Sequence, residues 1–176
     1  MIHLITGEVH SGKTSLLKEA VALWRGKGFP LAGFFSESKI TNGEIIGYDL
    51  IDVKGQTRTP YIRIQGEAGW PRSGCFFFIP DALEKACALI RNRTGADLLI
   101  VDEVGPLEMK GLGLWPALEQ ALLPGGLESV LVVRKKIAEE FGGMLNDAEL
   151  KVYDMLDPDV IAHLTDRFES YLKRAE

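Results

Sequence analysis

A glycine-rich turn between an apolar segment and a helical pattern constrains this chain more than any other feature. The turn spans residues 7–14, in which Gly7 is followed, after four residues, by Gly12, Lys13 and Thr14. The residues before it predict a strand and those after it share one face of a helix: Ile2, Leu4 and Ile5, then Leu16, Leu17, Ala20, Val21 and Trp24. Glycines let the backbone bend closely around an anion, so that successive N–H groups and the helix N-terminus face it. In this setting the motif is typical of a phosphate-binding P-loop.

The same loop predicts roles for individual side chains. Lys13 is placed to reach the β- and γ-phosphates of a nucleoside triphosphate, and the Thr14 hydroxyl is placed to ligate Mg²⁺. We therefore expect a nucleoside triphosphate and Mg²⁺ to bind here. The predicted nucleotide-binding residues are Gly7, Glu8, Val9, His10, Ser11, Gly12, Lys13, Thr14 and Ser15.

Composition narrows the class of protein. With 176 residues, 46% of them hydrophobic, the chain is expected to form a single domain over residues 1–176. A formal net charge of −5 argues against a nucleic-acid-binding protein. Cys75 and Cys87 are too few for a metal site or a disulfide framework, and no apolar stretch is long enough to span a bilayer. We expect a cytoplasmic protein that contacts neither membranes nor nucleic acids.

The order of predicted elements indicates an α/β domain with one irregular region. Strands are expected over residues 31–38, 45–53 and 57–64, with a tight turn at Asn42-Gly43, so that an antiparallel β insert over residues 31–64 follows the first helix. Asp81 and Glu84 then predict a capping box at the start of a helix. The remaining expected elements are strands at 98–101, 130–133 and 152–156 and helices at 114–122 and 161–172. This is the pattern of a doubly wound, mostly parallel α/β sheet.

A second motif completes the predicted site. The apolar run 98–101 ends in Asp102 and Glu103, the Walker B arrangement of P-loop proteins. Since the strand places both acids at its carboxyl end, where α/β sheets bind ligands, Asp102 is expected to hold Mg²⁺ opposite Thr14. Glu103 is expected to orient and polarise the water that attacks the γ-phosphorus.

The position of these acids also predicts a strand order. In P-loop proteins with Asp-Glu here, the next strand generally lies between the P-loop and Walker B strands, the RecA-like order. That strand is 130–133, so Arg134 at its end would point toward the γ-phosphate and stabilise charge in the transition state. The alternative is a solvated base beside Lys135 and Lys136. Weaker candidates for a phosphate contact, Arg58 and Arg63, lie in the insert.

The chain resembles the family of small nucleoside-triphosphatases known from thermophiles and as the cancer-related nucleoside-triphosphatase. The likeness covers about residues 1–142 and depends on the P-loop, Gly33-Phe34-Phe35, Ile46-Gly47-Tyr48-Asp49, and the segment from Asp102 to Glu108, which reads Asp-Glu-Val-Gly-Pro-Leu-Glu. The resemblance implies a RecA-like core, Mg²⁺-dependent hydrolysis of nucleoside triphosphates to diphosphate and phosphate, and broad tolerance of the nucleobase. Carried over by position, it implies that residues 7–14 bind phosphate, that Asp102 and Glu103 serve the metal and the water, and that Arg134 stands where family members usually carry a basic residue. Together with the motifs, this leads us to expect that Lys13, Glu103 and Arg134 are catalytic and that Thr14 and Asp102 bind the metal.

Two other functions share this fold and motif. A nucleoside or nucleotide kinase usually carries an arginine-rich lid, and here Arg91 and Arg93 are the only close arginine pair. A nucleotide switch regulated by a protein partner could present the insert or the C-terminal helix, although no residue pattern indicates such a partner. The chain also lacks the Asn-Lys-x-Asp segment that reads guanine in GTPases, so the sequence predicts no preference for GTP.

Overall fold

The computed structural model describes residues 1–8, 11–124, 126–145 and 148–175. Within these ranges, nine strands form one sheet in the order β5-β6-β4-β3-β2-β7-β8-β1-β9. The strands are β1 (Ile2–Gly7), β2 (Leu31–Thr41), β3 (Glu44–Asp52), β4 (Arg58–Arg63), β5 (Arg72–Ser73), β6 (Phe76–Phe78), β7 (Leu98–Val104), β8 (Glu128–Arg134) and β9 (Leu150–Asp154). The helices are α1 (Lys13–Gly26), α2 (Pro80–Arg91), α3 (Trp115–Leu122), α4 (Ala138–Met144) and α5 (Val160–Ala175).

The central strands are parallel and buried. β8 pairs with β1 on one side and with β7 on the other, so it separates the P-loop strand from the strand that carries the two acids, as the sequence predicted. β7 pairs in turn with β2, and β9 lies at the edge beside β1. Residues 98–101 of β7 and 130–133 of β8 are continuous apolar runs because helices cover both faces of the sheet there, whereas the edge strand β9 is partly exposed.

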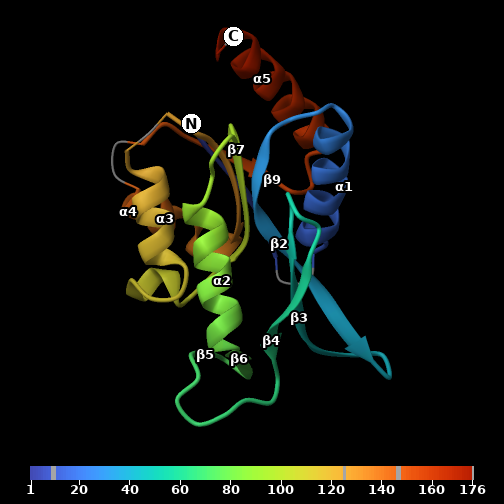
Figure 1. Cartoon of the computed structure of the whole chain (residues 1–176), viewed down its shortest axis with the longest axis vertical. Coiled ribbons are helices and arrows are strands. Elements are labelled where there is room, and N and C mark those ends of the chain that lie inside the picture. Colours follow the sequence, from blue (N-terminus) through green and yellow to red (C-terminus); the bar gives the residue numbers. More distant parts are fainter. Residues whose placement is uncertain (9–10, 125, 146–147, 176) are drawn as a thin grey trace.

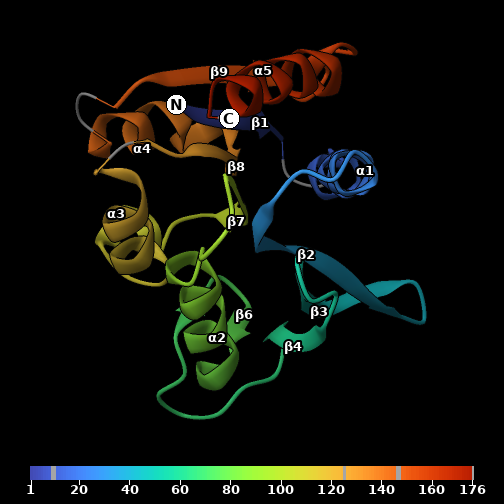
Figure 2. The same ribbon diagram turned by 45° about the horizontal axis from the view of Figure 1, so that its top comes forward.

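β2 belongs to both the parallel and the antiparallel parts of the sheet. Residues 31–34 pair in parallel with β7, and residues 34–41 pair antiparallel with β3. The chain reverses at Asn42 and Gly43, which both have positive φ, as hairpin turns of this kind require. β4, β6 and β5 extend the sheet further by antiparallel pairing. Figure 2 shows β4 and β6 beyond β3. The antiparallel strands therefore continue the main sheet and do not form a separate one.

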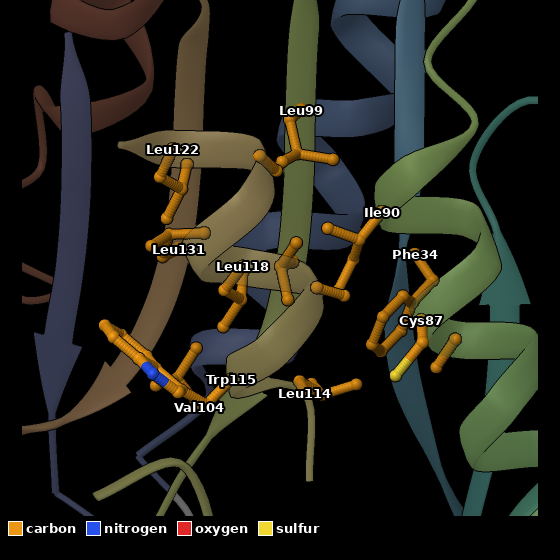
Figure 3. Packing of buried hydrophobic residues seen from close by; sticks show 14 of the residues in the cluster. Phe34, Cys87, Ile90, Leu99, Val104, Leu114, Trp115, Leu118, Leu122 and Leu131 are labelled. Carbon is orange, nitrogen blue, oxygen red and sulfur yellow. The ribbon is translucent and has the colours of Figure 1, made fainter. Parts of the chain in front are cut away.

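Helices pack on both faces of the sheet, and each face has its own core. α2, α3 and α4 lie on one face, and α1 and α5 lie on the other (Figure 1). On the first face, Ile90 of α2 and Leu118 and Leu122 of α3 pack over Leu99 and Leu131 of the sheet (Figure 3). Among the described residues, no helix is both long and apolar enough to cross a membrane.

The start of α2 differs from the sequence prediction. The helix begins at Pro80, Ile79 occupies the N-cap position, and no side chain caps it. The capping box predicted from Asp81 and Glu84 is therefore wrong. Proline has the backbone φ of a helix and lacks the N–H group that a cap would satisfy, so the helix starts two residues earlier than a cap at Asp81 predicts.

A buried ion network joins α5 to the amino end of the sheet. Glu128 at the start of β8 is 2% exposed, and its carboxylate lies 2.7 Å from Nε2 of His3 and accepts hydrogen bonds of 2.6 and 3.1 Å from Arg167. Burial by itself raises the pKa of Glu128, but the hydrogen bonds from His3 and Arg167 outweigh it, so the pKa lies below its usual value. A lowered carboxyl pKa stabilises the folded state above the unfolded-state value, and this stabilisation is lost as the pH falls through the folded-state value.

We expect Glu128→Gln to lower the free energy of unfolding by about 2 kcal/mol at pH 7, because Arg167 loses its buried partner charge. The deficit should shrink as the pH falls below the ordinary carboxyl pKa, where the unfolded chain takes up a proton, and should vanish below the lower folded-state pKa, where the wild-type carboxylate is itself protonated. Urea denaturation at pH 7 and at pH 4 measures both effects. Glu169→Gln, which removes a solvent-exposed partner of Lys27, is the control and should change stability little. A deficit of equal size at both pH values would contradict the electrostatic explanation.

Candidate active site

The P-loop closes tightly against the end of β9. A Cβ atom added to Gly7 would lie 2.6 Å from Cγ of Met155, the residue after β9, and 2.9 Å from Oγ of Ser11. Gly12 has a φ of 93°, and its carbonyl accepts the N–H of Leu16, so the loop leads directly into α1. The turn therefore needs glycine at its first position because side chains already fill the space. Val9 and His10 lie outside the described residues.

Lys13 folds back onto the loop. Its ammonium donates hydrogen bonds to the carbonyl oxygens of Gly7 (3.1 Å) and Glu8 and to Oγ of Ser11 (3.3 Å). Burial lowers the pKa of Lys13, and the negative charges of Glu103 and Asp102 oppose that shift. The loop thus holds a partly desolvated cation at its centre, where phosphate oxygens could replace the carbonyl partners.

Asp102 is held by three donors. Its Oδ2 accepts hydrogen bonds from Oγ1 of Thr14 (2.9 Å) and from the N–H of Ser36 (3.1 Å), and its Oδ1 accepts the N–H of Glu103 (2.9 Å). The residue is 1% exposed, and burial together with the carboxylate of Glu103 raises the pKa of Asp102 to about 7. Burial and the nearby carboxylate make the ionised form of Asp102 unfavourable, and a cation bound beside it would stabilise that form.

These groups fit a magnesium ion. Mg²⁺ prefers oxygen ligands, and the Thr14 hydroxyl and the Asp102 carboxylate meet within hydrogen-bond distance beside the P-loop. Among the residues that the structure describes, the Oγ atom of Ser36, next to Asp102, is also buried without a hydrogen-bond partner. Buried polar atoms normally have partners, so this hydroxyl, which lines the cavity, is available to a ligand or to a water that accompanies it.

Glu103 has an unusual backbone conformation. Its φ is +68°, in the left-handed region that side chains other than glycine rarely occupy. The pairing of β7 with β8 is interrupted between Val101 and Val104, which marks a β-bulge around the two acids. Bulges of this kind re-aim side chains, and here Glu103 lies half-buried in the cavity wall. Burial raises the pKa of Glu103, against the opposing charges of Arg134 and Lys13.

Arg134 lies at the end of β8, level with Gly7 on the neighbouring β1. It is half-buried and lines the same cavity as Lys13 and Glu103. The strand order brings it there because β8 lies between the two strands that carry the motifs.

Arg58 and Arg63 are engaged elsewhere. Both pair with the carboxylate of Asp49, at 3.1 and 2.5 Å, and neither is among the described residues that line the cavity. Their hydrogen bonds stabilise the antiparallel strands.

One cavity of about 470 Å³ brings most of the predicted residues together. The predicted residues that line it are Ser11, Gly12, Lys13, Thr14, Ser15, Asp102, Glu103 and Arg134. Gly7 and Glu8 do not line it, but their carbonyl oxygens hold Lys13. The cavity also continues over the antiparallel strands, where its lining includes Ser38, Tyr48, Ile62, Phe76 and Phe78.

Sequence reasoning missed the role of Glu108. This residue is 3% exposed, and its carboxylate accepts the N–H groups of Gly105 (2.8 Å) and Leu114 (2.9 Å). It therefore fixes the loop that leaves β7 directly behind the two acids. The available indication was an acid three residues after a glycine, Gly105-Pro106-Leu107-Glu108, in a segment that is otherwise apolar.

Comparison with known proteins identifies the family. The model of the NTPase family matches residues 3–159 of the chain. The chain belongs to this family. Curated members similar to it include the nucleoside-triphosphatase THEP1 of Hyperthermus butylicus, 27% identical over 78% of this chain and 73% of the relative. The cancer-related nucleoside-triphosphatase homolog of Bos taurus is 26% identical over 91% of this chain and 94% of the relative.

Solved structures share the fold. The solution structure of a human cancer-related nucleoside triphosphatase superposes with a TM-score of 0.67 and 24% identity, over 99% of this chain and 98% of the other. The crystal structure of THEP1 from Aquifex aeolicus superposes with a TM-score of 0.65 and 15% identity, over 93% and 96%. At these levels of sequence identity, the similarity to the two solved structures shows a shared α/β fold and nothing more.

Proposed function

We propose that this member of the NTPase family hydrolyses nucleoside 5′-triphosphates to the diphosphate and phosphate, with Mg²⁺ and with loose base specificity. The observation that carries the proposal is the convergence of Lys13, Thr14, Asp102, Glu103 and Arg134 around one cavity at the carboxyl ends of parallel strands. The names of the two curated relatives described above, both nucleoside-triphosphatases, support it.

Each group has a role in this reaction. The loop amides and Lys13 bind the β- and γ-phosphates, and the rigid loop positions the γ-phosphorus. Mg²⁺, held by Thr14 and Asp102, would neutralise phosphate charge. Glu103 accepts a hydrogen bond from the attacking water and takes its proton as the new bond forms. Arg134 stabilises the negative charge that develops on the γ-phosphate oxygens.

The proposal also includes loose specificity for the nucleobase and a cytoplasmic location of the protein. The sequence lacks the Asn-Lys-x-Asp segment that reads guanine in GTPases, and the cavity lining around the P-loop consists of groups suited to phosphate, which fits acceptance of several triphosphates. Both cysteines are free, which fits the reducing cytoplasm. We expect nucleoside triphosphates to be its main ligands.

Phosphate release from ATP, GTP, CTP and UTP, with Mg²⁺ and with EDTA, tests the proposal. We expect release from all four substrates, lost when the metal is removed. Tight nucleotide binding without release from any substrate would overturn it and would favour a kinase that lacks its acceptor or a switch that lacks its partner.

Replacing Arg134 with alanine tests the role of the arginine at the end of β8. We expect phosphate release to slow about a hundredfold, with ADP affinity nearly unchanged, because the guanidinium acts mainly on charge that develops in the transition state. Lys136→Ala is the matched control, since this neighbouring cation is exposed and outside the cavity lining. Equal rates for the two variants would contradict a role of Arg134 in the transition state.

A further inference from the structure

The cavity extends beyond the two acids into a second compartment. Directly opposite residues on neighbouring strands share a face of the sheet, and here Ser38 of β2 lies opposite Tyr48 of β3, Tyr48 opposite Ile62 of β4, and Ile62 opposite Phe78 of β6. Phe76 follows on the same face of β6. All five residues line the cavity, so an unbroken row of side chains forms one wall of it. We call the part of the cavity next to this row the aromatic compartment.

The rings of this compartment are arranged to accept a planar group. The centroids of Tyr48 and Phe76 lie 5.5 Å apart at 65°, so the two rings form a corner. Both rings are half-buried, whereas the aromatic residues of the core behind them, Phe34 and Tyr61, are fully buried. Rings left open to a cavity in this way offer faces for stacking.

Charge divides the cavity into two ends. Its lining cations, Lys13, Lys18 and Arg134, lie on α1 and at the end of β8, on the P-loop side. The lining residues described for the aromatic compartment are all uncharged, and Glu37, the acid that precedes Ser38 on β2, is paired with Lys18 and Arg58. The compartment thus suits a neutral molecule, because it offers a second phosphate group no free cation.

The compartment lies on the γ-phosphate side of the P-loop. A triphosphate bound as proposed has its γ-phosphate beside Glu103, and its nucleoside leaves from the α-phosphate at the opposite end. Asp102 accepts the N–H of Ser36, two residues before Ser38 on the same strand, and Ser36, Glu103 and Tyr48 all line the cavity. The aromatic rings are therefore reached past the acids, away from the nucleoside of the donor.

We propose that the aromatic compartment binds a second small molecule, a neutral planar compound of nucleoside type, with a hydroxyl group directed at the γ-phosphorus. The proposal depends on triphosphate binding at the P-loop. In the transfer step the hydroxyl oxygen of the acceptor forms a bond to the γ-phosphorus, and the bond from that phosphorus to the β–γ bridging oxygen breaks. The hydroxyl proton passes to Glu103, and the products are the nucleoside diphosphate and the phosphorylated acceptor. Hydrolysis is the same step with water in place of the acceptor.

Calorimetry with two matched ligands tests the compartment. Diadenosine tetraphosphate carries a nucleoside at each end of its phosphate chain, whereas adenosine 5′-tetraphosphate lacks the second one. We expect the first to bind about tenfold more tightly, since stacking of a base on aromatic side chains is largely independent of the base. Equal affinities in the wild-type protein would overturn the proposal without affecting the proposed hydrolysis.

Single substitutions in the aromatic compartment test whether the second nucleoside binds there. Tyr48→Leu and Phe76→Ala should each abolish the advantage of diadenosine tetraphosphate and leave ADP affinity unchanged. Phe77→Ala is the control, because the adjacent ring packs below Arg72, 5.2 Å from its guanidinium carbon, and does not line the cavity. Loss of ADP affinity in the Tyr48 and Phe76 variants, but not in the Phe77 variant, would place the base of the donor there and overturn the proposal.

Isotope transfer tests the reaction. Nucleosides that compete with diadenosine tetraphosphate are incubated with ATP labelled in its γ-phosphate, and products are separated by chromatography. Label in the nucleoside supports transfer. Label in free phosphate alone would overturn the transfer step while leaving hydrolysis intact, and label in neither product would overturn the proposed hydrolysis as well.

Discussion

Glu103→Gln is expected to slow phosphate release about a thousandfold while nucleotide affinity stays nearly the same. Glutamine has the shape of glutamate, so the bulge of β7 and the hydrogen bond from the Glu103 N–H to Asp102 can persist. The amide cannot take a proton from the attacking water, and this is the step assigned to the carboxylate. A loss confined to the rate is the sign of a group that acts only in the transition state.

Single-turnover phosphate release with saturating ATP, combined with ADP affinity from calorimetry, separates the chemical step from binding. Glu119→Gln on the exposed surface of α3 is the control and should keep the wild-type rate. If Glu103→Gln also kept that rate, another group would have to activate the water. A variant that lost ADP affinity as well would indicate that Glu103 shapes the P-loop side of the cavity.

The parts of the site that could be predicted from sequence are those set by local pattern. A strand, a glycine-rich turn and an amphipathic helix are contiguous, so residues 2–26 define the P-loop without any distant partner. The apolar run before Asp102 is likewise local, and its burial explains its composition. The placement of Arg134 followed from the strand order that usually accompanies Asp-Glu at this position, and the pairing of β8 between β1 and β7 agrees with it.

The parts that could not be predicted depend on contacts between distant segments. Ser36 resembles any polar residue at the end of a strand, and its orphaned hydroxyl is recognisable only once β2 lies beside β7. The positive φ of Glu103 results from the bulge between β7 and β8. The row from Ser38 to Phe78 joins four strands whose register no local pattern specifies. Sequence periodicity predicts which face a residue occupies, but not which residue lies opposite.

Gly33→Ala is expected to lower the free energy of unfolding by about 3–5 kcal/mol, although it adds only one methyl group. Gly33 has a φ of +99°, and a Cβ atom there would lie 1.9 Å from the carbonyl oxygen of Ile100, its partner on β7. The obstacle is backbone, which cannot move aside as a side chain can, so the two strands must separate. β2 also delivers the Ser36 N–H to Asp102, so the folded fraction should lose metal-dependent activity as well.

Urea denaturation of alanine variants at two further glycines separates the causes of this loss of stability. Gly43 in the hairpin turn has a φ of +81° but open space around its Cβ position, so Gly43→Ala should cost only about 1–2 kcal/mol of backbone strain. Gly26 in the last turn of α1 has neither constraint, so Gly26→Ala should be neutral or stabilise by up to about 1 kcal/mol. The excess cost at Gly33 over Gly43 measures the close approach of β2 to β7. If the two costs were equal, the sheet would accommodate a side chain at Gly33, and the contact between the strands would not be what requires glycine there.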